Sequence, residues 1–179
     1  MTHLARLACA CGKVRLDVAR APILSAECYC NSCREAGARI QALPSAPRVL
    51  GEKGGTRLVL YRKDRVHFVE GTELLKEFRL TPESPTRRVV ASCCNSPVFL
   101  EFEKGHWLSL YSGLWPHDSL PPVSERTMTS DLPDASVLSD DVPNSKRQSL
   151  AFFARLLGAW VAMGFRVPKV PAGGGTLHV

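Results

Sequence analysis

The seven cysteines of this 179-residue chain fall into three tight clusters, which constrain its fold more than any other feature. Spacings of C-x-C and C-x-x-C let one backbone turn offer two sulfurs to a tetrahedral metal ion. The odd count argues against a complete disulfide framework, and clustered cysteines in a reducing compartment are more often metal ligands. We therefore expect a scaffold organised around metal by these clusters: Cys9 and Cys11; Cys28, Cys30 and Cys33; Cys93 and Cys94.

The first and last clusters are each followed by a residue suited to a tight turn. Gly12 follows Cys11, and Asn95 follows Cys94. Glycine and asparagine adopt a left-handed backbone at the least cost. A turn that directs backbone N–H groups at a metal-bound sulfur needs such a residue directly after the cysteine. Two metal-binding turns, brought together by a sheet, are the expected result.

The middle cluster differs because Cys28, Cys30 and Cys33 supply three thiolates from one stretch with no obvious local fourth ligand. Three protein ligands are typical of an open, catalytic metal site, and four are typical of a closed, structural one. Two interpretations stay open: an open site, or a structural site completed by a distant residue such as a vicinal cysteine.

The chain has a formal net charge of +6, and part of it comes from a cluster of basic residues between positions 48 and 65. Such a stretch is most often a solvated basic face, although it can attract nucleic acid, an acidic surface or an anionic small molecule. The sequence has no RNA-binding or helix-turn-helix signature, so nucleic acid is not an expected partner. The basic residues of this stretch are Arg48, Lys53, Arg57, Arg62, Lys63 and Arg65.

Short strands separated by turn residues dominate the first two thirds of the chain, which is typical of an antiparallel β domain. Strict alternation predicts a strand directly after the first cluster. The two segments that flank Lys63 and Asp64 are predicted to be neighbouring strands. Residues 34–37 are predicted to form a helical turn that Gly37 stops. The predicted strands are 13–18, 57–61, 65–69, 75–80, 87–91, 97–102 and 107–111.

The C-terminal third is predicted to hold an irregular linker, one helix over about 145–164 and a flexible tail over 172–179. Ser145 and Gln148 fit a capping box, Gly164 can end the helix, and Pro168 forbids its continuation. One apolar face is expected to pack on the β domain or on a partner subunit, with a membrane surface as the alternative. That face comprises Leu150, Phe153, Leu157, Trp160, Val161 and Gly164.

Neither a signal peptide nor a membrane-spanning segment is predicted. The N-terminus lacks a long apolar region, and the most apolar stretch, Leu150 to Phe165, is short and contains Arg155. We expect a cytoplasmic protein with no membrane partner, which could form a homo-oligomer through its C-terminal helix.

The cysteine motifs resemble those of the glutathione-dependent formaldehyde-activating enzyme (GFA) family, also called the centromere-protein-V type domain. The resemblance covers residues 3 to 115 and extends less fully to 135. It implies an Mss4-like fold of antiparallel sheets stapled by zinc, with a GFA-like domain over residues 1–135 and an appendage over 136–179. The motifs are Cys9-x-Cys11-Gly12-x-Val14-x-Leu16, Cys28-x-Cys30-x-x-Cys33-Arg34, and Arg87-Arg88 ahead of Cys94-Asn95-Ser96-Pro97.

By resemblance, Cys9, Cys11 and Cys94 are ligands of a structural zinc, and the middle cluster holds a second, reactive zinc. The chain departs from the family pattern at Ala91, where the family has a cysteine, and Cys93 instead precedes Cys94 directly. We favour Cys93 as the fourth structural ligand. Three alternatives remain: a three-sulfur site completed by water, a Cys93 side chain turned toward the second metal, and a vicinal disulfide.

The resemblance implies a carbon–sulfur lyase type of enzyme, which joins a glutathione-like thiol to an aldehyde or cleaves the adduct. Two zinc ions per chain and a small-molecule thiol are the implied cofactor and partner. A non-catalytic zinc module that serves as scaffold, metal carrier or partner-binding domain is the alternative. Arg34 or the basic stretch is expected to offset the thiolate charge. His67, His106 and His117 are candidate general bases, although a lone histidine is more often structural.

Overall fold

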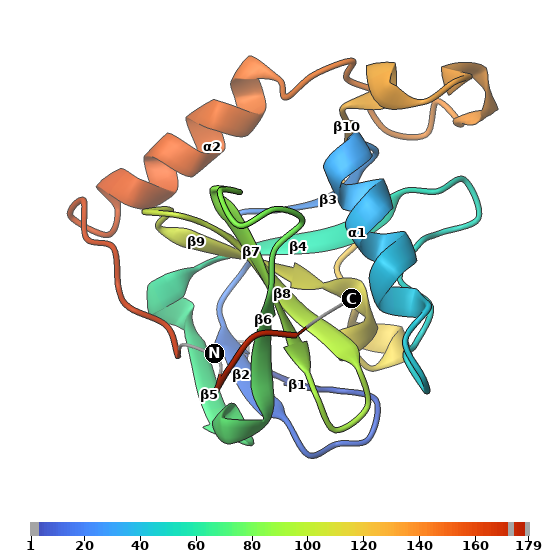
Figure 1. Ribbon diagram of the computed structural model, residues 1–179. Helices are drawn as coiled ribbons and strands as arrows, with labels where there is room; N and C mark the ends of the chain where they lie inside the picture. The colour runs from blue at the N-terminus through green and yellow to red at the C-terminus, as the bar shows by residue number, and fades with distance from the viewer. Residues whose placement is uncertain (1–3, 172–173, 178–179) are drawn as a thin grey trace.

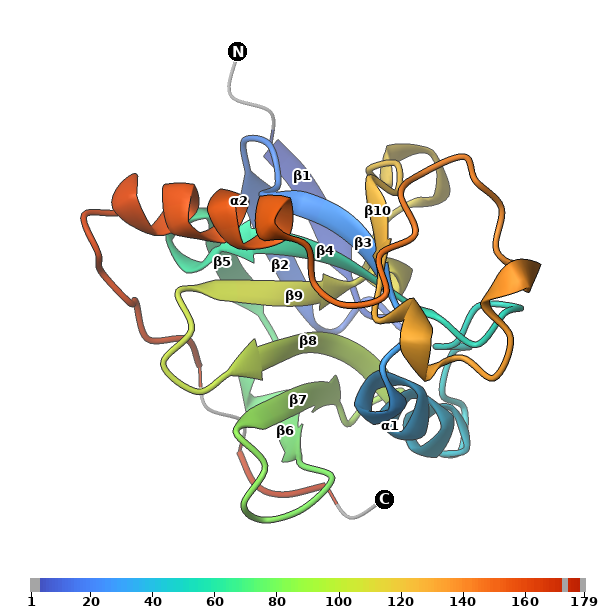
Figure 2. The ribbon, with the colours of Figure 1, turned by 90° about the horizontal axis from the view of Figure 1, so that it is seen from above.

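The computed structural model describes residues 4–171 and 174–177, and its strands form two sheets (Figures 1 and 2). The smaller sheet has the order β1-β2-β5, and the larger has the order β10-β3-β4-β9-β8-β7-β6. Neighbouring strands are antiparallel, except that β10 runs parallel to β3. The expected class, mainly β with a C-terminal helix, is confirmed. The strands are β1 (Leu4–Ala8), β2 (Arg15–Ala19), β3 (Leu24–Cys28), β4 (Thr56–Arg62), β5 (Val66–Glu70), β6 (Leu75–Phe78), β7 (Thr86–Ala91), β8 (Ser96–Phe102), β9 (Trp107–Tyr111) and β10 (Glu125–Thr127).

Two α-helices and several single-turn 3₁₀ segments connect these strands. Helix α1 spans Asn31–Gln41, and helix α2 spans Leu150–Val161. Within the described residues, neither helix has the length and apolar character needed to cross a membrane. The 3₁₀ segments are Lys63–Arg65, Thr72–Leu74, Ser112–Leu114, His117–Ser119, Thr129–Asp131 and Ala135–Val137.

The prediction that residues 57–61 and 65–69 form neighbouring strands is wrong. β4 lies in the larger sheet between β3 and β9, and β5 pairs with β2 in the smaller sheet. The 3₁₀ turn at Lys63–Arg65 carries the chain from one sheet to the other. The sequence also gave no prediction of β1, β3 or β10, because their few apolar residues do not form a distinct strand pattern.

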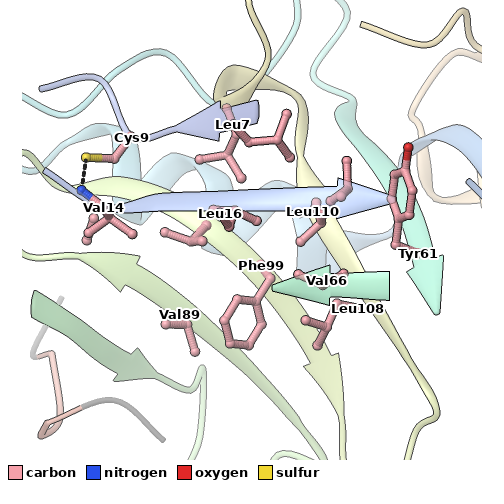
Figure 3. Close-up of a cluster of buried hydrophobic side chains, with 14 of the residues drawn as sticks. Leu7, Cys9, Val14, Leu16, Tyr61, Val66, Val89, Phe99, Leu108 and Leu110 are labelled. Carbon is pink, nitrogen blue, oxygen red and sulfur yellow. Dashed lines mark hydrogen bonds between the residues drawn. The ribbon is translucent and has the colours of Figure 1, made fainter. Parts of the chain in front are cut away.

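The larger sheet separates two cores because its side chains alternate between its faces. Val59 and Tyr61 of β4 pack against the smaller sheet, and Leu58 and Leu60 pack on the opposite face. Figure 3 shows the first core, with Leu16 among residues from both sheets and Cys9 at its border. The two cysteine groups described below border different cores.

Helix α1 is longer than the single turn predicted from the sequence. It continues through Gly37 to Gln41. A Cβ atom at position 37 would lie 2.5 Å from Leu50 Cδ2. Gly37 therefore packs closely against the Leu50 side chain, and it does not end the helix.

Helix α2 starts five residues later than predicted. Its N-cap is Ser149, whose hydroxyl accepts a hydrogen bond from the Phe152 N–H at 3.0 Å. The proposed cap, Ser145, instead donates its backbone N–H to Arg126 of β10 at 2.9 Å. The helix ends at Val161 with Ala162 as its C-cap, earlier than predicted. Gly164 lies in the turn that follows and adopts a left-handed φ of 61°.

The face that the sequence assigned to packing is mostly turned outward. Leu156 and Met163 are buried, whereas Leu150, Phe153 and Leu157 are exposed. The predicted face was wrong because α2 is apolar on both sides, so spacing alone could not select the packed one. The backbone carbonyl of Leu156 also hydrogen-bonds the buried His106 ring, which attaches the helix to the β8–β9 turn.

Part of the predicted flexible tail is ordered against β6. The Gly174 N–H donates to the Leu75 carbonyl at 2.7 Å, and the Leu177 N–H donates to the Glu77 carbonyl at 2.7 Å. Residues 174–177 therefore extend the edge of the larger sheet. Residues 172–173 and 178–179, which belong to the same predicted tail, lie outside the described residues.

A glycine substitution tests how closely the turn before β6 packs beside the first cysteine turn. Gly71 has a φ of 77°, and an added Cβ would collide with the Lys13 backbone. We expect Gly71→Ala to lower the free energy of unfolding by about 1–2 kcal/mol through strain and by about 1–3 kcal/mol more through the collision.

The matched control is Gly164→Ala, at a φ of 61° with open space around the added methyl. It should cost only the strain of about 1–2 kcal/mol. Urea denaturation of both variants measures the difference, and equal losses would contradict the close approach of Gly71 to Lys13.

Candidate metal centres and pocket

The first cysteine group joins two turns that lie far apart in the sequence. Cys9 and Cys11 follow β1, while Cys93 and Cys94 occupy the turn between β7 and β8. All four sulfurs lie within 4.8 Å of one another. The Sγ–Sγ distances are 3.6 Å for Cys9–Cys11, 3.8 Å for Cys9–Cys93, 3.3 Å for Cys11–Cys93 and 3.9 Å for Cys93–Cys94.

These distances fit a tetrahedral metal, because metal–sulfur bonds of about 2.3 Å place neighbouring sulfurs about 3.8 Å apart. Gly12 and Asn95 have φ values of 76° and 52°, so both turns have the predicted left-handed residue. The Val14 N–H donates to Cys9 Sγ at 3.3 Å, as Figure 3 shows. The donor set and the turns therefore fit a bound metal ion.

Cys93 lies in this group, while Ala91 is buried at the end of β7. All seven cysteines are free thiols, so Cys93 and Cys94 form no vicinal disulfide. Burial raises the pKa of the Cys9 and Cys93 thiols. Burial also opposes ionisation of Cys94, but hydrogen bonds, chiefly from Ser96, outweigh it and hold the pKa of that thiol at about 6.

The second group is built around the start of α1. Cys28 ends β3, Cys30 is the N-cap of α1, and Cys33 lies in its first turn. Cys30 Sγ accepts the Cys33 backbone N–H at 3.3 Å, and the Cys28 and Cys30 sulfurs are 3.4 Å apart. A helix N-terminus favours thiolates through its free N–H groups and dipole.

The three thiols share their negative charge unequally. Hydrogen bonds from Cys28 and then Cys33 lower the pKa of the Cys30 thiol to about 3. The Cys30 hydrogen bond in turn raises the pKa of Cys28 to about 11, and hydrogen bonds with Cys28 and Cys30 also raise the pKa of Cys33. A single thiolate on Cys30 therefore dominates near neutral pH without metal, and a bound cation would displace the other two protons.

Within the described residues, no histidine, cysteine or carboxylate joins Cys28, Cys30 and Cys33 as a fourth ligand. The vicinal cysteines belong to the other group. They border the core between the two sheets, whereas Cys33 belongs to the core on the opposite face of the larger sheet. The three sulfurs fit a metal ion that has one position left for a further ligand.

A cavity of 380 Å³ opens beside this second group, between the larger sheet and both helices. Its walls are mainly apolar. Gln148 and Phe152, from the segment that leads into α2 and from α2 itself, complete it. The other lining residues are Ala26, Cys28, Cys30, Ser32, Cys33, Leu58, Leu60, Ser84, Pro85, Thr86, Arg88, Leu100, Phe102, Trp107, Ser109, Thr127 and Met128.

Arg88 is the only charged residue that lines the cavity, among the described residues, and it is 1% exposed. Its Nη2 donates to Ser32 Oγ at 2.7 Å and to the Ser32 carbonyl at 3.2 Å. In the described structure, its Nε and Nη1 have no hydrogen-bond partner and no carboxylate pairs with it. A buried guanidinium needs a counter-charge. The charge of Arg88 helps to lower the pKa of the Cys30 thiol, so we assign the Cys30 thiolate as its partner.

The cations and bases expected from the sequence do not surround the cavity. Arg34 donates instead to the Asp131 carbonyl at 3.1 Å. The basic stretch is not an open face throughout, because Lys63 is buried and pairs with Glu101, and Arg62 pairs with Asp64 at 2.5 Å.

Neither His67 nor His106 lines the cavity. His67 is exposed on β5. His106 is buried, and its ring stacks on Trp160 with 5.5 Å between centroids. The side chain of His117 lies outside the described part of the structure.

Sequence reasoning noted Arg88 only within the resemblance and missed Trp107, Gln148 and Phe152. The sequence does place a charged residue, Arg88, at an inward position of a strand. Its neighbours in β7 are mostly buried, so this charge could have been noticed. Phe152 gave no signal because the opposite face of its helix is equally apolar.

The fold and the cysteine groups define a mainly β protein with two sites able to bind metal. The family model of the glutathione-dependent formaldehyde-activating enzyme matches residues 5–125, and the chain belongs to this family. No curated protein matches the chain. A crystal structure of a Rhodobacter sphaeroides protein is similar at 15% identity, with a TM-score of 0.45, over 68% of this chain and 97% of that chain.

Replacing Arg88 tests whether its charge is paired with the cysteine group. Removing one partner of a buried charge pair costs about 3–5 kcal/mol. We therefore expect Arg88→Met to lower the free energy of unfolding by about 3 kcal/mol in urea denaturation.

The control is Arg34→Met. Arg34 follows Cys33 in the sequence but does not line the cavity. It should lower stability by only about 0.5–1.5 kcal/mol, the cost of the hydrogen bond that Arg34 donates to the Asp131 carbonyl. Equal stability of Arg88→Met and the wild type would show that the cysteine group does not compensate the buried charge.

Proposed function

We propose that this protein is a zinc-dependent carbon–sulfur lyase that acts on adducts of a glutathione-like thiol with an aldehyde. The observation that carries the proposal is that one cavity is lined both by Cys28, Cys30 and Cys33 and by the buried Arg88. The described residues offer these three cysteines no fourth ligand. Membership of the family supports a thiol as substrate.

Zinc is the metal that we propose for both groups, giving two ions per chain. Thiolate-rich tetrahedral sites favour zinc over magnesium, calcium or manganese. Cys9, Cys11, Cys93 and Cys94 would hold a structural ion, and Cys28, Cys30 and Cys33 the reactive one. Seven free thiols suit a reducing compartment, which agrees with a cytoplasmic location.

The proposed reaction is the reversible breakdown of a hemithioacetal. The carbon–sulfur bond breaks, the hydroxyl proton is lost as the carbonyl forms, and the departing sulfur gains a proton to become a free thiol. Zinc bound at the second group would supply Lewis acidity and a position for the thiol sulfur. The reaction needs no oxidant or reductant.

The protein's own residues bind and orient the adduct. Three thiolates around a divalent ion leave one net negative charge, and Arg88 offsets it from within the wall. The N-terminus of α1 fixes the position of Cys30, because Cys30 is also the helix cap. Ser109 and Thr127 supply hydroxyl groups in a cavity that is otherwise mainly apolar.

The wall composition indicates that the aldehyde part of the adduct is apolar. Leu58, Leu60, Leu100 and Phe152 line the cavity, and a formaldehyde adduct has no side chain to fill the space between them. We infer that larger alkyl or aromatic aldehydes are better substrates, since each buried methylene adds about 0.8 kcal/mol of binding.

A non-catalytic zinc module is the second candidate function. The observation that favours it is the lack of a histidine or carboxylate among the described residues that line the cavity. In that case the second ion would be carried or held for a partner. Activity of the metal-loaded protein distinguishes the two functions.

Two cysteine substitutions test the roles of the two groups. Cys11→Ser should lose one zinc per chain and lower the Tm by more than about 10 °C, because a structural metal contributes several kcal/mol to folding. Cys30→Ser should lose the other zinc and still fold, because a serine hydroxyl can replace the sulfur as helix cap. Its free energy of unfolding should fall by about 3 kcal/mol, because Arg88 loses its anionic partner.

Elemental analysis, thermal unfolding and NMR exchange between free aldehyde and thiol adduct are measured on both variants and the wild type. Acceleration of exchange by the wild type and its loss in folded Cys30→Ser support the lyase. A wild type that holds two zinc ions and accelerates no adduct exchange would establish the non-catalytic module.

The aldehyde preference is tested at two neighbouring phenylalanines. Phe152 lines the cavity, whereas Phe153 is 55% exposed. Phe152→Ala should raise the KM for adducts of long-chain aldehydes about tenfold or more and leave the formaldehyde adduct nearly unchanged. Phe153→Ala should change neither value, and equal effects of the two substitutions would contradict the assignment of the wall.

A further inference from the structure

Helix α2 and the turn after it present an unusual concentration of exposed apolar side chains. Six of the ten large hydrophobic residues exposed in the described structure lie between positions 150 and 167. Such a concentration marks an interaction site or a membrane contact. These side chains, which we call the outer face, are Leu150 (89% exposed), Phe153 (55%), Leu157 (56%), Val161 (53%), Phe165 (58%) and Val167 (40%).

The outer face cannot be buried by turning the helix. Leu156 is 5% exposed and Met163 is 2% exposed, so the opposite side already packs on the β domain. The hydrogen bond between His106 Nε2 and the Leu156 carbonyl, at 2.8 Å, fixes this orientation. Figures 1 and 2 show α2 along the outside of the molecule, beyond the larger sheet.

The charges of this segment identify what can cover the outer face. Residues 145–179 contain five basic residues and no aspartate or glutamate. All five basic residues are exposed: Lys146 and Arg147 before the helix, Arg155 within it, and Arg166 and Lys169 after it.

The acidic groups that lie near α2 are already paired. Glu125 accepts from Arg155 at 3.4 Å, and Asp64 pairs with Arg62, whose Nη2 donates to the Ala162 carbonyl at the helix end. An apolar stripe with basic residues at both ends is complementary to a lipid surface that carries negative charge.

We propose that the outer face of α2 docks on an anionic membrane surface. The helix would lie in the interfacial plane, with Phe153, Leu157 and Val161 among the acyl chains and the flanking lysines and arginines at the headgroups. The β domain, which covers the other side of the helix, takes the place of the polar face of a free amphipathic helix. A second copy of the chain fits less well, because its own outer face carries the same positive charge.

The test uses the full-length protein, metal-loaded as purified, in flotation with phosphatidylcholine vesicles that contain or lack phosphatidylserine. Wild type should float with the phosphatidylserine vesicles. Replacing Lys146, Arg147, Arg166 or Lys169 by glutamine should weaken binding about fivefold each. Val161→Asp should abolish flotation.

The matched control is Val69→Asp, since Val69 on β5 is 55% exposed and Val161 is 53% exposed. Val69→Asp should float like the wild type, and both variants should keep the wild-type circular dichroism spectrum. Analytical ultracentrifugation without vesicles completes the design.

Two results would overturn the proposal. One is wild type that stays unbound on both kinds of vesicle. The other is a wild-type dimer that Val161→Asp converts to monomer without any vesicle binding, because the outer face would then be covered by a second copy. Neither result bears on the proposed lyase, which is measured without lipid.

Discussion

The alternation of side chains along the central strands of the larger sheet is the constraint on which the rest of the structure depends. In β4, Val59 and Tyr61 face the smaller sheet, while Leu58 and Leu60 face the cavity. A slip of one residue would exchange the two faces and expose both cores. Each cysteine group borders a different core, so this register also places the two groups. The first group stabilises the packing of the two sheets, and the second group lies beside the cavity.

The two groups differ in charge compensation as well as in position. The first lies between turns whose backbone N–H groups and Ser96 hydroxyl stabilise its sulfurs, as at Cys9 and Cys94. The second combines the N-terminus of α1 with the buried charge of Arg88. A guanidinium without a carboxylate is costly to bury, so a fold that keeps Arg88 there requires anionic sulfur beside it. This requirement connects the stability of the fold to the chemistry of the cavity.

Much of the metal-binding part was predictable from the sequence, because close cysteine spacing and the turn residues Gly12 and Asn95 act locally. The pairing of β5 with β2 was not, since it depends on a sheet change at a 3₁₀ turn with no distinct signature. The length of α1 was missed because Gly37 reads as a helix stop when its contact with Leu50 is unknown. Arg88 and Phe152 could be placed at the cavity only once the strands were in register.

Helix α2 has two apolar sides, so the sequence could not show which of them packs on the β domain. A helix that packs on one side of a domain and is otherwise solvated needs only one apolar stripe. Here Leu156 and Met163 form one stripe, and Leu157 and Val161 form another on a different side. The first stripe holds the helix against the domain, where Phe152 completes the cavity wall. The second is more than half exposed, and the proposed membrane surface accounts for its apolar character. A partner on that surface would contact the same helix that completes the cavity wall through Phe152.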